Sequence, residues 1–506
     1  MARSRDPLTP LEQAMRTRAV KRGIIAAIVL AILAIGVGLL VQRYSADRPA
    51  TYEGIEDHFK YGSIGSDIEN GLPVRILAVL PRMFPEYLPE GGKQDYTAFG
   101  FIQEPGHILP IGFSIRRRLI DLAGLNCAVC HVGKIKAAAD ASPQTILGMP
   151  ANTLDLLAFF EFLINCATDN RFTARHIVAE MEKDGDINAI DRIIYGLAVP
   201  QLQAGILKIA AQLNRFKFPV HPKFGPGRVD TFNPYKVNQY SEFYPLGSLT
   251  DDERIGTSDF PAIWNQRPRE GLNLHWDGNN SSVRERNFSA AFGAGATRDH
   301  VDSAAFDRVT EWLLDLPPPR YPFEITSDMD VLARGEAVYK ERCFACHDFK
   351  GKQVGQVDPI ESIGTDPHRL NSYTERLAEI QRTYGHGYAW DFSHFHKTDG
   401  YANAPLDGIW ARAPFLHNGS VPTLSDLLTP EDARNGGRPY FFRGHGVYDP
   451  VNVGIRTDVE EADGRKSFRF VLAEPGNSNR GHSGPAYGTD LPDDDKRALI
   501  EYLKTF

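Results

Sequence analysis

The sequence predicts a mainly α-helical protein made of two helical domains with long, loop-rich insertions, preceded by one transmembrane helix. Three observations support this fold class. A short cysteine–histidine motif occurs twice, far apart in the 506-residue chain. One uncharged apolar segment stands near the N-terminus. The apolar–polar alternation that marks half-buried strands is sparse, whereas several segments have the apolar spacing of helices.

The apolar segment "GIIAAIVLAILAIGVGLLV" (Gly23–Val41) is just long enough to cross a bilayer. It is longer than the core of a usual signal peptide, and no clear small-x-small cleavage site follows it. We therefore predict a retained anchor at residues 23–42 after a cytoplasmic tail at residues 1–22, in preference to a cleaved signal. The positive-inside rule places the rest of the chain across the membrane, because basic residues precede the segment at Arg3, Arg5, Arg16, Arg18, Lys21 and Arg22.

Each copy of the motif has two cysteines separated by two residues and followed at once by a histidine. The copies are "CAVCH" (Cys127, Cys130, His131) and "CFACH" (Cys343, Cys346, His347). In haem c attachment the two thiols bind the haem vinyl groups and the histidine ligates the iron. A zinc site would need four ligands, and a redox dithiol needs neither the histidine nor a second copy. The motifs therefore predict two covalently bound haem c groups.

Haem c is attached on the far side of the membrane, so the motifs and the anchor agree. Together they predict a single-pass protein of the bacterial inner membrane with its soluble part in the periplasm. The net charge is −8 and the basic residues are scattered, which excludes a nucleic-acid surface. A calcium ion is a further candidate cofactor.

In the first part of the chain, residues 43–112 and 216–275 are rich in turn-forming residues and predict irregular structure. "IRRRLIDLAGLNCAVCH" predicts a helix that delivers the first motif. "NTLDLLAFFEFLINCAT" predicts a buried helix in which Asn152 and Asp155 are spaced as a capping box. Cys166, in this helix, is expected to be an inert buried thiol.

In the second part, "SDMDVLARGEAVYKERCFACH" predicts a helix running into the motif, and "LPDDDKRALIEYLKTF" predicts the helix that closes the chain. A small cytochrome c fold has this layout, with the two helices crossing beside the haem. The proline-rich "LPPPRYPFE" predicts a stiff linker. The expected domains are a first haem c domain at 43–318, holding the active-site haem, and a second cytochrome c domain at 319–506, holding an electron-transfer haem.

The sixth iron ligands decide the function. No methionine follows the second motif, so a histidine–methionine pair is not expected there. His482, in the loop "GNSNRGHSGPAYGT" before the last helix, is the preferred sixth ligand, with His417 as the alternative. For the first haem, Met149 is a weaker candidate than an open sixth position, and an open position makes a reaction site.

The segment "DFPAIWNQRPREGLNLHWDGNN" resembles the bacterial dihaem cytochrome c peroxidase superfamily. That resemblance makes Trp276 the tryptophan between the haems, and "APFLHNGSVPTLSDLL" resembles the loop after the second haem. The sequence departs from the peroxidases in three ways. Residues 252–263 hold no histidine to cap the first haem, Glu285 is the only glutamate soon after Trp276, and the second-haem methionine is absent.

These departures, with "GIWARAPFLHNGSVPTL" and "GNSNRGH", resemble the branch typified by the bacterial rubber oxygenase and related dihaem fatty-acid dioxygenases. In that branch the second haem has two histidine ligands, which corresponds here to His347 and His482. The first haem can bind dioxygen in an apolar pocket, for which Phe288 and Phe292 are candidate aromatic residues. Simple core packing explains these two phenylalanines equally well.

The resemblance implies a haem oxidoreductase that activates O2 at the first haem on an apolar substrate, with the second haem as electron relay and Trp276 coupling the two. A peroxidase acting on hydrogen peroxide and an electron-transfer cytochrome without substrate chemistry are the alternatives. The expected partners are O2 or peroxide and a redox donor or acceptor, either a protein or a component of the quinone chain. Apolar surroundings without a carboxylate favour dioxygen chemistry over acid–base cleavage of peroxide.

Overall fold

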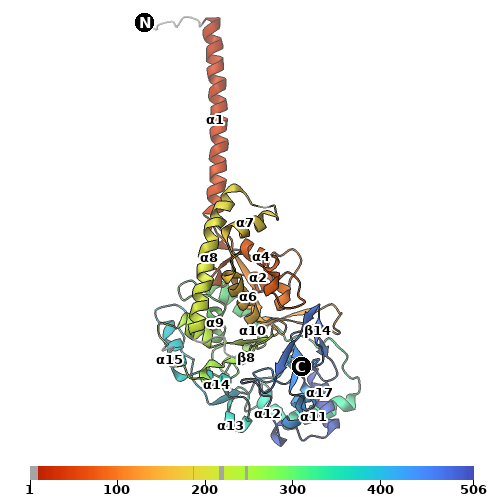
Figure 1. Ribbon diagram of the computed structural model, residues 1–506. Coiled ribbons are helices and arrows are strands. Elements are labelled where there is room, and N and C mark those ends of the chain that lie inside the picture. Colours follow the sequence, from red (N-terminus) through yellow and green to blue (C-terminus); the bar gives the residue numbers. More distant parts are fainter. Residues whose placement is uncertain (1–8, 186, 216–221, 245–248) are drawn as a thin grey trace.

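The computed structural model describes residues 9–185, 187–215, 222–244 and 249–506. A single long helix, α1 (Pro10–Tyr44), projects from a body that holds all the other described elements (Figure 1). The apolar stretch of α1, Met15–Gly38, has a mean hydropathy of 2.3 and is not buried. Such a helix fits either a single-pass membrane anchor or a signal sequence. A second helix, α8 (Ala189–Arg215), is also long and apolar enough to span a bilayer by length and composition.

The body begins with a four-stranded antiparallel sheet in the order β1-β3-β4-β2. Its strands are β1 (Arg48–Pro49), β2 (Leu72–Pro73), β3 (Phe113–Arg117) and β4 (Leu122–Leu125). The helix predicted for "IRRRLIDLAGLNCAVCH" is therefore wrong, because most of that segment forms the β3–β4 hairpin. Gly124 shows why a strand fits here. A Cβ at this position would lie 2.4 Å from Ser66 Oγ, so the backbone packs against the neighbouring helix more closely than a larger residue allows.

Residues 43–112 contain more regular structure than the sequence predicts. They include α2 (Ile55–Tyr61), α3 (Ser66–Glu69), α4 (Val74–Met83) and two short 3-10 turns. The apolar face of α4, with Ile76 and Leu80 fully buried, packs into the core beside the sheet. A short amphipathic helix can form inside a turn-rich stretch because tertiary packing supplies most of its stability.

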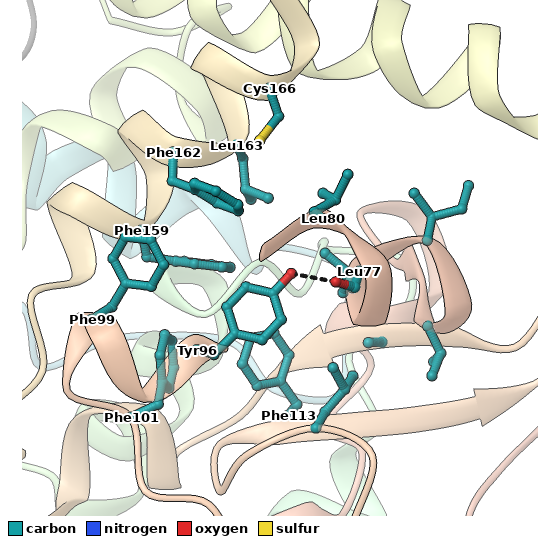
Figure 2. Close-up of a cluster of buried hydrophobic side chains, with 14 of the residues drawn as sticks. Leu77, Leu80, Tyr96, Phe99, Phe101, Phe113, Phe159, Phe162, Leu163 and Cys166 are labelled. Carbon is teal, nitrogen blue, oxygen red and sulfur yellow. Dashed lines mark hydrogen bonds between the residues drawn. The ribbon is translucent and has the colours of Figure 1, made fainter. Parts of the chain in front are cut away.

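The first core is an aromatic cluster centred on Tyr96 (Figure 2). The Tyr96 hydroxyl donates to the Leu77 carbonyl at 2.7 Å, so a buried polar atom is satisfied. Helix α6 (Leu156–Thr168) lines this cluster and confirms the predicted buried helix. Its N-cap is Asp155, while Asn152 binds the backbone of Lys134 instead of capping. Cys166 is fully buried, and burial raises the pKa of its thiol, as expected for an inert residue.

The second part has the layout that the sequence predicts. Helix α11 (Met329–Arg342) leads into α12 (Phe344–His347), and α17 (Asp493–Leu503) closes the chain. Helices α11 and α17 cross in close contact. At the crossing, a Cβ on Gly335 would lie 2.1 Å from the Ala498 carbonyl oxygen. Only glycine permits this approach, which positions the helix that carries the second motif.

The remaining helices have 4 to 13 residues, and one of them, α7 (Ala174–Glu182), packs on α8. The others are α5 (Ala128–His131), α9 (Val283–Gly293), α10 (Ser303–Asp315), α13 (Ile360–Ile363), α14 (His368–Ser372), α15 (Glu375–Tyr384) and α16 (Leu424–Leu427). The other strands form two-stranded antiparallel pairs: β5 (Val132–Ile135) with β6 (Gln144–Leu147), β7 (Arg228–Asp230) with β8 (Thr257–Asp259), β9 (Val357–Pro359) with β10 (Gly400–Ala402), β11 (Tyr440–Arg443) with β16 (Phe468–Val471), β12 (Tyr448–Asp449) with β13 (Gly454–Ile455), and β14 (Glu461–Ala462) with β15 (Arg465–Lys466).

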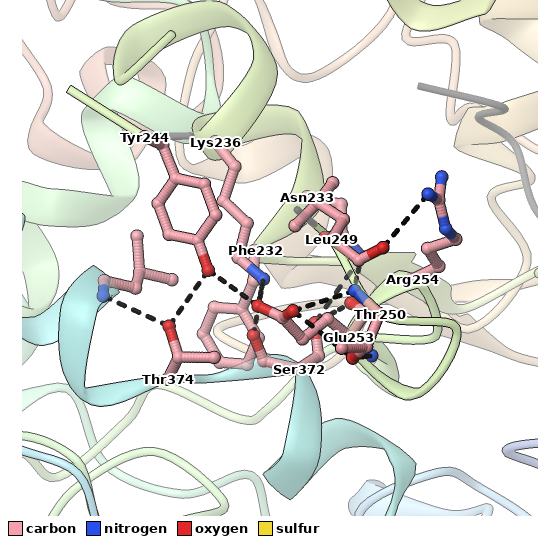
Figure 3. Close-up of polar contacts among 12 residues, drawn as sticks. Phe232, Asn233, Lys236, Tyr244, Leu249, Thr250, Glu253, Arg254, Ser372 and Thr374 are labelled. Carbon is pink, nitrogen blue, oxygen red and sulfur yellow. Dashed lines mark hydrogen bonds and ion pairs between the residues drawn. The ribbon is translucent and has the colours of Figure 1, made fainter. Parts of the chain in front are cut away.

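Segments on both sides of the proline-rich linker share one aromatic cluster. Side chains between Phe232 and Phe306 and between Tyr373 and Phe395 belong to the same buried set. A polar network ties them together as well (Figure 3). Lys236, which is fully buried, donates from Nζ to the Ser372 carbonyl at 2.7 Å and lies 3.7 Å from Glu253. The chain after the linker thus packs deeply against the chain before it.

Candidate haem sites and the segment between them

The first motif begins where β4 ends. Asn126, which is buried, donates from Nδ2 to the carbonyls of Lys60 and Gly62 and accepts from the Ala128 amide. These bonds fix the turn that leads from the strand into α5. His131, at the end of α5, donates from Nδ1 to the Pro261 carbonyl at 2.9 Å. Its Nε2 is therefore the nitrogen left to ligate a metal.

The second motif repeats this arrangement. His347, at the end of α12, donates from Nδ1 to the Ala404 carbonyl at 2.7 Å. The same carbonyl-to-Nδ1 bond in both motifs orients the ring and directs Nε2 away from the backbone. Burial lowers the pKa of His131 to about 4 and also lowers that of His347. Both rings are consequently neutral near pH 7, the form in which imidazole ligates metals.

The four motif thiols do not resemble those of a redox dithiol. Burial raises the pKa of Cys127 to about 11 and that of Cys130 to about 12. It raises the pKa of Cys343 to about 11 and also raises that of Cys346. Reactive dithiols have lowered pKa values because the thiolate is the attacking species. Raised pKa values leave few thiolates near pH 7, which disfavours disulfide exchange at these cysteines.

His482 faces His347 across a gap. Their ring centroids are 6.3 Å apart with an angle of 46° between the ring planes. Two imidazoles that each bind one metal ion at about 2 Å place their centroids about 6 Å apart. The buried Nδ1 of His482 has no partner among the described residues. The two histidines therefore fit a haem iron held between them.

The loop carrying His482 is held in place by Arg434, a residue that the sequence did not single out. Arg434 is 1% exposed and donates to the carbonyls of Gly481 and His482, each at 2.8 Å. His482 has a positive φ of 49°, and its amide donates to the Ile363 carbonyl. These contacts orient the imidazole toward His347. No local pattern distinguishes Arg434 from other arginines, so the sequence carries no signal for this role.

His417, the alternative sixth ligand, lies elsewhere. Its ring stacks on Tyr401 with centroids 4.2 Å apart, and its backbone carbonyl accepts from the Asp259 amide. Burial lowers the pKa of His417 to about 3. His347 makes its ring contact with His482 and not with His417. Met149, the weaker candidate for the first haem, is 2% exposed and packs in a core cluster with Trp264.

Two hydrogen bonds connect Trp276 to the chain segments that hold the two motif histidines. Its Nε1 donates to the Asp259 carbonyl at 3.0 Å, and Asp259 stands two residues before Pro261, the partner of His131. The Trp276 carbonyl accepts from the Ala402 amide at 2.9 Å. Ala402 stands two residues before Ala404, the partner of His347. Trp276 is therefore hydrogen-bonded to both of the chain segments that hold the motif histidines, residues 259–261 and residues 402–404.

Buried ion pairs hold this arrangement. Asp277, next to Trp276, is fully buried and pairs with Arg369 at 3.0 Å. Asp259 pairs with Arg443 at 2.9 Å, with both side chains nearly inaccessible. Each pair joins a residue before the proline-rich linker to one after it. Paired charges inside a protein fix relative position, because separating them would leave an uncompensated buried charge.

Phe288 and Phe292 lie on α9 inside the aromatic cluster. They are 0% and 2% exposed, and both contact Trp390 and Phe392. Cys127 of the first motif packs against the edge of the same cluster. The structure thus brings these phenylalanines to the side of the first motif, embedded among other rings. Their role in a distal pocket stays a prediction beside their evident packing role.

Glu285, the only glutamate soon after Trp276, accepts several hydrogen bonds. Its oxygens accept from the amides of Ser393 and His394, each at 2.9 Å, and from His394 Nδ1 at 2.7 Å. Although burial opposes it, these bonds lower the pKa of Glu285. The carboxylate is therefore ionised and occupied with structural bonds. In the described residues, no group of three or more His, Cys, Asp or Glu side chains could hold a further metal ion, and calcium binding stays a prediction.

Comparison with known proteins agrees with the haem assignment at a coarse level. A family model described as "RoxA-like, cytochrome c-like" matches residues 400–442. This segment contains the Ala404 carbonyl that holds His347, together with His417 and Arg434. A cytochrome c-like domain implies covalently bound haem c, so the protein is a c-type haem protein with a RoxA-like domain. The predicted resemblance is confirmed at this level, while the particular branch and the number of haem groups stay predictions.

Two relatives come from Sinorhizobium fredii (strain NBRC 101917 / NGR234). Uncharacterized protein y4iJ is 28% identical, with 82% of this chain and 85% of the relative covered. Uncharacterized protein y4iM is 29% identical, with 54% of this chain and 68% of the relative covered. The first similarity extends over most of the chain and is therefore not confined to the matched haem segment.

Proposed function

We propose that this chain is a membrane-anchored, periplasmic oxidoreductase with two haem c groups. In this proposal the haem at His131 activates O2 for reaction with an apolar substrate, and the haem between His347 and His482 relays electrons. Haem c supplies single-electron chemistry and, where a coordination position is open, reactivity toward O2. Cys127 and Cys130 would attach the first group, and Cys343 and Cys346 the second.

The observation that carries this proposal is the difference between the two motif histidines. His347 has a second imidazole facing it at the separation expected for a shared metal. Among the described residues, His131 has no such ring contact with another histidine. The second site is therefore suited to electron transfer without ligand exchange, and the first to chemistry at an open position.

Trp276 supports communication between the two sites. Its side chain and its carbonyl are hydrogen-bonded to the chain segments that hold His131 and His347. The buried ion pairs Asp277–Arg369 and Asp259–Arg443 hold those chain segments in fixed relative positions. Trp276 is consequently positioned by both halves of the body, as a residue coupling two redox sites would need to be.

Two features favour dioxygen over hydrogen peroxide. Cleavage of peroxide benefits from a side chain that moves a proton between the two oxygens. Glu285 is ionised and engaged by Ser393 and His394, so it is not free for this task. The aromatic cluster containing Phe288 and Phe292 would exclude water beside the first motif and give an apolar substrate an apolar surface to pack on.

Labelled dioxygen tests the proposal directly. The purified protein is incubated with it and with a panel of unsaturated lipids and isoprenoids, and products are read by mass spectrometry. Incorporation of the label is the expected result. Trp276→Phe should slow turnover while both haem groups remain attached, whereas the matched Trp312→Phe, on an aromatic contact with Phe59, should not.

The other assignments predict different results. Rapid hydrogen peroxide turnover with reduced cytochrome c, and no label in any product, would instead establish a peroxidase. If neither reaction occurs and the reduced protein binds no carbon monoxide, both haem groups are closed and the chain is an electron-transfer cytochrome.

A further inference from the structure

The tip of the β3–β4 hairpin, residues 118–121, lies at the foot of α1. Strand β1 pairs with β3 in antiparallel register, with Arg48 opposite Arg117 and Pro49 opposite Arg116. In an antiparallel pair, each step back along one strand matches a step forward along the other. One further step of this register places Asp47 level with Arg118, and the pairing of Arg116 with Leu122 places the turn of the hairpin around Leu119. Because α1 ends at Tyr44, three residues before Asp47, the hairpin tip lies close to the end of the helix.

Side chains reinforce this register. Asp47 accepts from Arg116 Nε at 2.5 Å and pairs with Arg118 Nη2 at 3.2 Å. Four residue steps separate Tyr44 from Arg48, a span of at most about 14 Å in an extended chain. The body is thus tied closely to the end of the helix, and a bilayer containing α1 would have its surface at the hairpin tip.

The tip has the composition of a membrane-surface contact. Arg117 is 54% exposed, Arg118 is 37% exposed, and Leu119, within the turn, is 52% exposed. Arg48 and Arg116–Arg118 carry four positive charges against the two negative charges of Asp47 and Asp121, a net charge of +2. Exposed arginines around one apolar side chain suit anionic headgroups above an acyl layer.

The hairpin also leads straight to the first motif. Strand β4 (Leu122–Leu125) runs from the tip to Asn126 and Cys127. Eight residue steps from Leu119 to Cys127 span at most about 26 Å at the rise of a strand. Any contact that holds the tip would therefore hold the first haem motif at a set height above the bilayer.

We propose that the hairpin tip binds anionic phospholipid headgroups of the bilayer that holds α1, with Leu119 at the boundary between headgroups and acyl chains. This contact fixes one orientation of the body and keeps the first haem motif close to the membrane surface. The inference rests on the proposed retention of α1 as an anchor.

Hydrogen–deuterium exchange on the full-length protein tests this contact. The protein is reconstituted into vesicles of phosphatidylcholine alone and of phosphatidylcholine with phosphatidylglycerol. Amides of residues 118–121 should exchange several-fold more slowly in the anionic vesicles, and high salt should remove the difference because it screens surface charge. The double variant Arg117→Gln/Arg118→Gln should abolish this protection, because each arginine should strengthen binding to the anionic surface about fivefold.

Two controls keep the outcome clear. Arg456→Gln, at an exposed arginine that pairs with Asp458, should leave the hairpin protection unchanged. Leu119→Asn, which retains both arginines, should reduce the protection without altering exchange in α11. Equal exchange in both vesicle types, from a protein of full-length mass that floats with the vesicles, overturns the docking proposal alone. A purified protein whose mass lacks α1 and that fails to float overturns the anchor as well.

Discussion

Replacing His482 with alanine removes the imidazole that faces His347. The two centroids are 6.3 Å apart, about twice the distance from a metal to the centre of an imidazole that binds it. An alanine methyl group ends short of that midpoint by roughly a ring's length and offers no nitrogen. Arg434 binds the loop through backbone carbonyls, so the loop should keep its shape without the ring.

In the proposed protein with two haem groups, one of them should therefore lose its sixth ligand. If the first haem is already open, the low-spin signals in absorbance and electron paramagnetic resonance should fall almost to zero. Carbon monoxide bound by the reduced protein should rise from about one to about two per chain. Added imidazole should restore the low-spin signal, which a merely unfolded site would not allow.

His417→Ala is the matched control. His417 is also buried, but its ring stacks on Tyr401 and does not face His347. This variant should keep the low-spin signal of the wild type. An unchanged spectrum in the His482 variant, or loss of the low-spin signal in the His417 variant, would refute the paired-histidine assignment.

Three further predictions concern attachment and stability. Cys130→Ala or Cys346→Ala should leave one haem per chain by mass, whereas complete extraction of haem from the wild type by acidified acetone would contradict covalent attachment. Arg443→Leu leaves the buried Asp259 without its partner and should lower the free energy of unfolding in urea by about 3 to 5 kcal/mol. The control Arg456→Leu, at the exposed pair with Asp458, should lower it by less than about 1 kcal/mol. Equal unfolding midpoints of the two variants would contradict this contrast. Burial lowers the pKa of Lys236 from 10.5 to about 8, so the folded state binds fewer protons than the unfolded state between these values and stability should rise with pH across that window. Relative to Lys236→Met, the wild type should gain about 3 kcal/mol from pH 8 to 10.5, and parallel pH profiles of the two proteins would rule out this linkage.

Local patterns predicted several elements correctly. The apolar periodicity of "NTLDLLAFFEFLINCAT" predicted α6, and the segments around the second motif predicted α11, α12 and α17. These features could be predicted because periodicity, capping residues and covalent motifs are properties of a few adjacent residues. The helix expected over "IRRRLIDLAGLNCAVCH" was wrong for the complementary reason. Its residues tolerate a helix, but pairing with β1 and the close approach at Gly124 favour a hairpin.

The sequence by itself determined the chemistry that the protein can hold: two cysteine–histidine motifs, no methionine after the second, and an apolar helix near the N-terminus. Only the tertiary structure decided which distant groups meet. It placed His482 opposite His347 through a loop held by Arg434, and it connected Trp276 by hydrogen bonds to the chain segments that hold His131 and His347. These contacts depend on packing and buried ion pairs throughout the body of the protein, and a short stretch of sequence does not contain that information.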